Sequence, residues 1–179
     1  RRKARWILGN RPNLGTALLP VLRSWLLDSS ESGFDSTELA DLFSKLSANP
    51  SVADLLGEML TDGNSTTEAK RMIVGMMIRS DDQAAVESWM TGIVALIQSR
   101  DTHLLNEATR AAAHLANDKL DRRSLLKELM RLSVDTSVHL KERLVAIGVL
   151  VKHIETLQNV QFTAMIDGLR LEQPVLVRS

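Results

Sequence analysis

Residues that could do chemistry are few in this sequence, and their spacing does not bring them together. Cys is absent, which excludes disulfides, thiolate zinc sites, iron–sulfur ligation and Cys nucleophiles. Among the four His residues, His103 and His114 can share a helix face, but at about 1.5 Å per residue they lie about 16 Å apart. One metal ion cannot span that distance. The sequence also lacks a Gly-x-Ser-x-Gly elbow and a Gly-rich phosphate loop, so we expect no catalytic site, no cofactor and no metal.

Clustered basic residues are the remaining candidates for a binding site. They lie at the start of the chain and in its second half, at Arg1, Arg2, Lys3, Arg5, Arg122 and Arg123. The whole chain has 22 Lys and Arg residues against 22 Asp and Glu residues, and residues 31–66 are strongly acidic. Holding a phosphate backbone requires a surplus of positive charge. We therefore expect these six residues to contact another protein or a flanking domain rather than nucleic acid.

The elements that carry these residues are predicted to be helices. Leu, Ala and Met dominate the apolar positions, and apolar residues do not alternate with polar ones over long windows. Helix starts are indicated by Asn49 before Pro50, by a capping box at 65–68, and by Asp82, Asp101, Asp121 and Thr136. The predicted helices cover about residues 2–10, 14–28, 36–47, 50–61, 66–79, 83–99, 102–117, 121–133, 137–155 and 160–170. The chain is therefore predicted to be all-α.

A repeat of 31 to 37 residues organises these helices. Small residues recur near the middle of the first helix of each pair, at Gly9, Ala40, Gly75, Ala112 and Gly148. A helix between its own partner and the next repeat must be apolar around most of its circumference, and we expect the small residue where two backbones come closest. The pattern predicts an α–α superhelix of about five helical hairpins, forming a single domain over residues 1–179.

Several side chains have predicted roles inside this array. Trp6, Trp25 and Trp89 are expected to fill gaps between repeats, and the Met-rich helix 66–79 is expected to pack in the core. Glu68 with Arg71, and Glu107 with Arg110, have the i,i+3 spacing of helix ion pairs.

With these hairpins the chain resembles the HEAT and armadillo-like α-solenoids, in which a first helix with a small residue in an apolar run precedes an amphipathic second helix. The resemblance covers nearly all of residues 1–170 and implies an extended recognition surface. The signature Pro of the first HEAT helix and the paired Asp/Arg ladder are missing or erratic. Residues 55–62, Leu-Leu-Gly-Glu-Met-Leu-Thr-Asp, also resemble the HEAT segment of large bacterial proteins that carry a β-propeller and a c-type cytochrome, although the haem-binding Cys-x-x-Cys-His motif is absent.

Three functions follow as hypotheses. The first is a non-catalytic helical-repeat scaffold for protein–protein or interdomain interaction, which we expect to be a fragment of a larger protein. The alternative is a HEAT-like nucleic-acid-binding protein or DNA glycosylase-like enzyme, which requires a concave basic face. The third is a closed bundle around a small ligand. No apolar run approaches the ~18–20 residues needed to cross a bilayer. The missing catalytic residues favour the scaffold.

Overall fold

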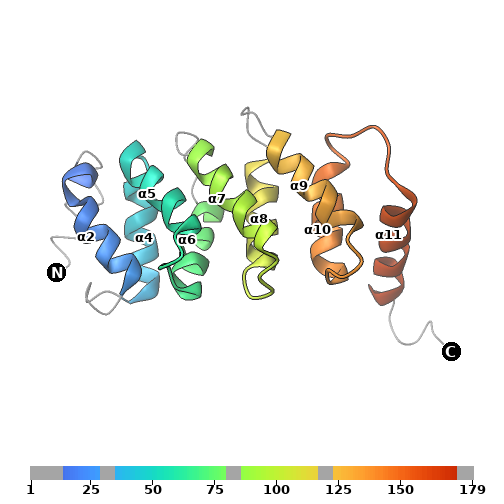
Figure 1. Cartoon of the computed structure of the whole chain (residues 1–179), viewed down its shortest axis with the longest axis horizontal. Coiled ribbons are helices and arrows are strands. Elements are labelled where there is room, and N and C mark those ends of the chain that lie inside the picture. Colours follow the sequence, from blue (N-terminus) through green and yellow to red (C-terminus); the bar gives the residue numbers. More distant parts are fainter. Residues whose placement is uncertain (1–13, 29–34, 80–85, 117–122, 173–179) are drawn as a thin grey trace. The chain divides into compact units, whose positions relative to one another are not determined.

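The computed structural model describes residues 14–28, 35–79, 86–116 and 123–172, and within them it is helical with no strand (Figure 1). The helices are α2 (Gly15–Leu27), α4 (Ser36–Leu46), α5 (Pro50–Thr61), α6 (Thr67–Arg79), α7 (Val86–Ser99), α8 (Leu105–Leu115), α9 (Arg123–Val134), α10 (Leu140–Leu150) and α11 (Asn159–Glu172). The prediction of an all-α chain is confirmed. The predicted helix 2–10 lies outside the described residues.

Local capping explains where several helices begin. Asn49 caps α5 by accepting a hydrogen bond from the Ser51 amide at 3.0 Å, with Pro50 as the first helical residue, as predicted. At α6 the cap is Thr66, whose hydroxyl accepts from the Ala69 amide at 3.1 Å. The predicted role of Ser65 as the capping residue is therefore wrong. Its side chain is buried and turns toward the sulfur of Met59 instead.

Other predicted caps differ in outcome. Asp101 accepts from the His103 amide at 2.8 Å in the turn before α8. The start of α10 is capped by His139, which accepts from the Lys141 amide through Nδ1, and not by Thr136. Asp82 and Asp121 lie outside the described residues.

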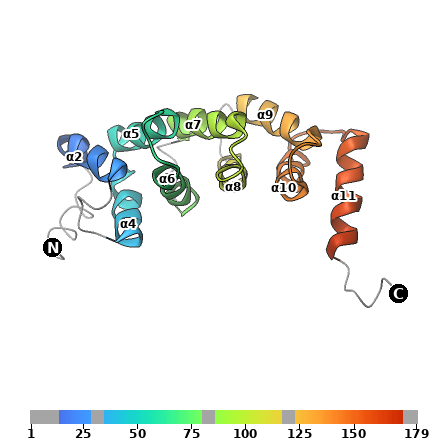
Figure 2. The same cartoon turned by 60° about the horizontal axis from the view of Figure 1, so that its bottom comes forward.

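Contacts divide the chain into two compact units, residues 1–120 and residues 121–179. In the first unit the helices form two rows, which we call the A row (α4, α6, α8) and the B row (α2, α5, α7) (Figure 2). Within each row a helix packs beside the next, and the rows are joined by contacts of α5 with α4 and α6 and of α7 with α8. The sequence predicts that helix 66–79 pairs with helix 83–99. In the structure the main neighbours of α7 are instead α5 and α8. This two-row packing is consistent with a helical solenoid.

Close backbone approach occurs in the B row. A Cβ atom on Gly57 of α5 would lie 2.7 Å from the Ser88 carbonyl oxygen of α7, and one on Gly92 of α7 would lie 2.8 Å from Leu60 Cδ1. Gly15 of α2 is equally tight against Val52 of α5. Only a residue without a side chain allows these helices to pack so closely.

The close approaches predicted at the recurring small residues are only partly correct. Ala40 and Ala112 are buried. A Cβ atom on Gly75 would meet only the end of the Arg79 side chain, at 3.9 Å, and one on Gly148 of the second unit would meet nothing within 4 Å. Neither glycine therefore marks a close approach of two backbones, and Gly75 is half-buried while Gly148 is exposed. Gly9 lies outside the described residues.

The core of the first unit contains the predicted large residues. Trp89 is buried, and its Nε1 donates a hydrogen bond to the Ala53 carbonyl of α5 at 3.0 Å. Met76 and Met77 of α6 are fully buried, which agrees with the core role predicted for this helix. Trp25 is half-buried, and Trp6 lies outside the described residues.

The second unit consists of α9, α10 and α11 in the described residues. Helix α10 packs extensively on α9, and α11 packs on α10 and touches α9. The side-chain amide of Gln161 is buried. Its nitrogen donates a hydrogen bond to the Ser133 hydroxyl of α9 at 2.6 Å, and its oxygen accepts one from the backbone amide of Gln158 at 2.7 Å. The predicted helix 137–155 is shorter in the structure, because the Leu150 carbonyl accepts from the amides of both His153 and Ile154 and the chain turns there.

Candidate functional site

Of the six basic residues predicted to bind a partner, the structure describes only Arg123. Arg1, Arg2, Lys3, Arg5 and Arg122 lie outside the described residues. Arg123 is exposed as the first residue of α9. Their role in partner binding stays a prediction.

The part of the chain that the structure describes gives no support for metal chemistry. No three His, Asp or Glu side chains come close enough there to hold a metal ion. Within the same residues, no helix is long and apolar enough to cross a membrane.

Among the residues that the structure describes, the most exposed large apolar side chains lie on α11. Phe162, Ile166 and Leu169 are 52%, 50% and 65% exposed, and Met165 and Val160 are also exposed. The spacing of 162, 165, 166 and 169 places four of these residues on one side of the helix. We call this set, Phe162, Met165, Ile166 and Leu169, the α11 face. A large exposed apolar patch of this kind is a common property of interaction sites.

A groove borders the α11 face. It has a volume of about 280 Å³ and is lined by Leu144, Ile147, Gly148 and Val151 of α10 and by Met165, Gly168 and Leu169 of α11. We call it the α10–α11 groove. Its lining carries no charged side chain. Because Gly148 has no side chain, the surface of α10 is hollowed at this point.

The packing of α11 explains why its large side chains remain outside. The side of α11 against the other two helices carries Gln161, Ala164 and Gly168, all of which are buried. A Cβ atom on Gly168 would lie 2.7 Å from Leu144 Cδ1, so this side is already in close contact with α10. The bulky residues at 162, 165, 166 and 169 therefore lie on another side of the helix and stay accessible.

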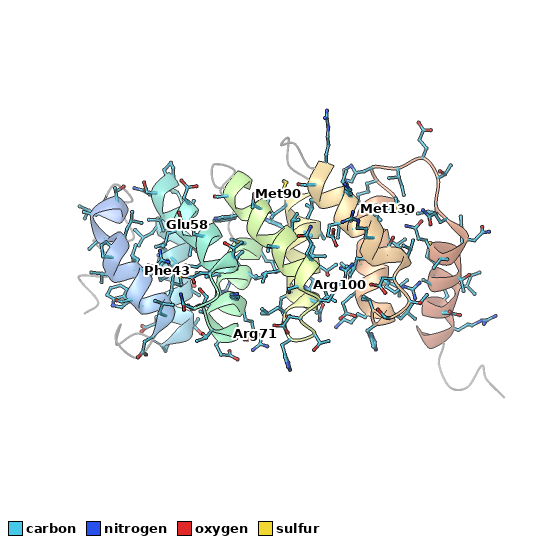
Figure 3. All side chains as sticks on the ribbon, viewed as in Figure 1. Phe43, Glu58, Arg71, Met90, Arg100 and Met130 are labelled. Carbon is cyan, nitrogen blue, oxygen red and sulfur yellow. The ribbon has the colours of Figure 1, made fainter. Side chains whose placement is uncertain are left out.

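A second groove, of about 340 Å³, lies in the first unit between α2, α4 and α6. Arg71 of α6 lines it and is labelled in Figure 3. Its guanidinium is held by Glu68 at 2.8 Å, by the His103 carbonyl at 3.2 Å and by Glu107 of α8 at 3.7 Å. The predicted pair Glu68–Arg71 is thus confirmed, and Glu107 reaches back to Arg71. Because these groups already bind one another, this groove is a weaker candidate for a partner site.

Sequence reasoning missed the α11 face. The signal was present, since apolar residues recur at 162, 165, 166 and 169 with helical spacing. Such a stripe ordinarily faces the core, and nothing in the sequence marks Gln161, Ala164 and Gly168 as the buried side instead.

Comparison of the chain with models of known protein families, with characterised proteins and with solved structures finds no match.

Proposed function

We propose that this chain is a non-catalytic helical-repeat scaffold of the HEAT or armadillo-like kind, which binds another protein or a flanking domain through the α11 face and the α10–α11 groove. The observation that carries the proposal is the continuous apolar surface formed by four exposed side chains of α11 beside a groove with no charged lining. Burial of such a surface on association is favourable by about 25 cal/mol for each Å² removed from water.

The composition of the surface supports binding rather than catalysis. Its lining consists of aliphatic side chains, Met and Gly, which offer neither a nucleophile nor an acid–base pair. Met165 adds an adaptable side chain, which suits a recognition surface.

The test compares a tagged wild-type chain with the double variant Phe162→Ser/Ile166→Ser in cross-linking capture from extracts of the native cells. Both residues are about half exposed, so we expect the variant to keep its far-UV circular dichroism spectrum and unfolding midpoint. The proteins captured by the wild-type chain should be lost from the variant.

The matched control is Val21→Ser/Leu27→Ser. It removes two exposed apolar side chains from α2, in the first unit, and should retain the captured proteins. Equal capture by the wild-type chain and the α11 variant, or equal loss from the α2 control, would contradict the proposal.

A further inference from the structure

We infer that the occupant of the α10–α11 groove is an amphipathic helix that inserts aliphatic side chains into the groove and carries acidic side chains along one flank. This inference rests on the proposed function and specifies the chemistry of the partner.

The backbone chemistry of the groove favours a helical occupant. The lining offers apolar side chains of α10 and α11, whose own backbone groups are bonded within their helices. An extended peptide would bury amide and carbonyl groups against this lining without partners, which is unfavourable. A helix satisfies its backbone internally and presents side chains alone.

The spacing of the lining also matches a helix. Leu144, Ile147 and Val151 of α10 follow one another at intervals of three and four residues, and Met165 and Leu169 of α11 are four apart. Two neighbouring ridges of this kind accept a third ridge with the i, i+3, i+7 spacing that helix-in-groove recognition uses.

The rim along α10 is basic. Lys141 and Lys152 are both exposed. Lys141 lies seven residues before Gly148 and Lys152 lies four residues after it. With this spacing the three residues share one side of α10 and of the turn that follows it. At about 1.5 Å per residue the two ammonium-bearing positions are about 16 Å apart. Among the described residues, neither Lys141 nor Lys152 takes part in an ion pair.

None of the nearby carboxylates that the structure describes forms an ion pair with Lys141 or Lys152. Asp167 pairs with Arg170 on α11 at 3.7 Å, and Glu142 lies 3.5 Å from His139. Glu155, in the loop after α10, is exposed. Two free lysines beside an apolar groove favour acidic residues on the flank of an incoming helix, and they disfavour basic ones.

Fluorescence anisotropy with synthetic peptides tests the inference. One peptide is an 18-residue helix of about five turns, with Leu at i, i+3, i+7 and Glu at two flank positions 11 residues apart. Its matched partner carries Lys in place of Glu, and a third peptide carries Ser in place of Leu. We expect the acidic peptide to bind about three- to tenfold more tightly than the basic one at low salt, with a smaller gap at high salt. The Ser peptide should not bind.

Variants of the chain provide the second half of the experiment. Lys141→Glu/Lys152→Glu should reverse the preference between the acidic and basic peptides. Lys45→Glu/Lys127→Glu makes the same change in net charge at exposed positions of α4 and α9 and should leave the preference unchanged. Leu169→Asp should weaken both peptides more than about tenfold, since it places a charge at the groove.

Any of the following outcomes would overturn the inference. Equal affinity for the acidic and basic peptides removes the role of the lysines. A dimer in light scattering that Leu169→Asp dissociates identifies a second copy as the occupant, and binding to anionic lipid vesicles that the same variant abolishes identifies a membrane. If no peptide binds but the capture experiment still depends on α11, only this inference fails. If capture is also independent of α11, the proposed function fails with it.

Discussion

At the scale of single residues, glycines in similar helices have opposite environments. Gly57 faces the backbone of α7, whereas Gly148 faces open space. In both helices glycine is a poor helix former compared with alanine. The difference between the two sites is therefore set by packing, and their alanine variants should respond in opposite directions.

We expect Gly57→Ala to lower the free energy of unfolding by about 1–3 kcal/mol, because the new methyl group would lie 2.7 Å from a carbonyl oxygen that cannot move without its helix. Gly148→Ala should raise it by about 0.5–1 kcal/mol through helix propensity alone. Urea unfolding followed by circular dichroism measures both. A neutral Gly57→Ala variant would show that α5 and α7 are not in close contact.

Asp62 links two helices through charge. The backbone amide of Asn64 and the guanidinium of Arg23, at 2.9 Å, lower the pKa of the Asp62 carboxyl below its ordinary value of 3.8, against an opposing effect of burial. Because the pKa is lower in the folded chain than in the unfolded one, this carboxylate stabilises the fold above pH 3.8, and the contribution is lost as the pH falls through the folded value.

The variant Asp62→Asn should therefore be less stable than the wild-type chain at pH 7. The gap should narrow as the pH falls below 3.8, where the wild-type carboxyl takes up its proton. Unfolding midpoints measured from pH 7 to pH 2 give the comparison. A gap that stays constant over this range would mean that the charge of Asp62 has no stabilising role.

At the scale of elements, the buried side-chain amide of Gln161 links α11 to α9. Gln161→Ala removes the donor to Ser133 and leaves the Gln158 amide without its acceptor, so we expect a loss of about 1–3 kcal/mol in unfolding free energy. Thr163→Ala, on the exposed side of the same helix, should change it by less than about 0.5 kcal/mol. Equal effects of the two variants would rule out a special role for Gln161.

Helices of this chain are largely predictable from sequence because their signals are local. The cap at Asn49 with Pro50, the apolar spacing of helix 50–61 and the turn before α8 all act within a few residues. Errors arose where neighbouring groups compete locally, as with Ser65 and Thr66 at the start of α6. There the Ser65 hydroxyl is buried, and the Thr66 hydroxyl caps the helix instead.

The relations between helices were less predictable, since they depend on contacts distant in the sequence. The recurrence of small residues predicts close approach at Gly75 and Gly148, but the close contacts are at Gly15, Gly57, Gly92 and Gly168. A glycine in the sequence marks a position without a side chain, but it does not tell which neighbouring helix, if any, packs against that position. For the same reason the apolar stripe of α11 could not be distinguished from a buried one.

At the scale of the whole molecule, charge is balanced, with a sequence pI of about 7.1. Nucleic-acid binding depends mainly on neutralising phosphates with a cationic surface. We therefore expect no binding of a duplex of about 20 base pairs at about 50 mM or 200 mM salt in an anisotropy titration. Affinity at the lower salt that weakens at the higher one would favour the alternative of a nucleic-acid-binding protein.

The burial of Trp89 has a practical consequence for optical experiments. Trp6, Trp25 and Trp89 all belong to the first unit, and the chain contains no Tyr. Indole emission therefore reports on residues 1–120 alone, and Trp89, bonded to the Ala53 carbonyl, should emit at short wavelength while α5 and α7 stay together. The second unit contributes no Trp or Tyr fluorescence. A single Trp introduced there would therefore report on binding or unfolding at α11 separately from the first unit.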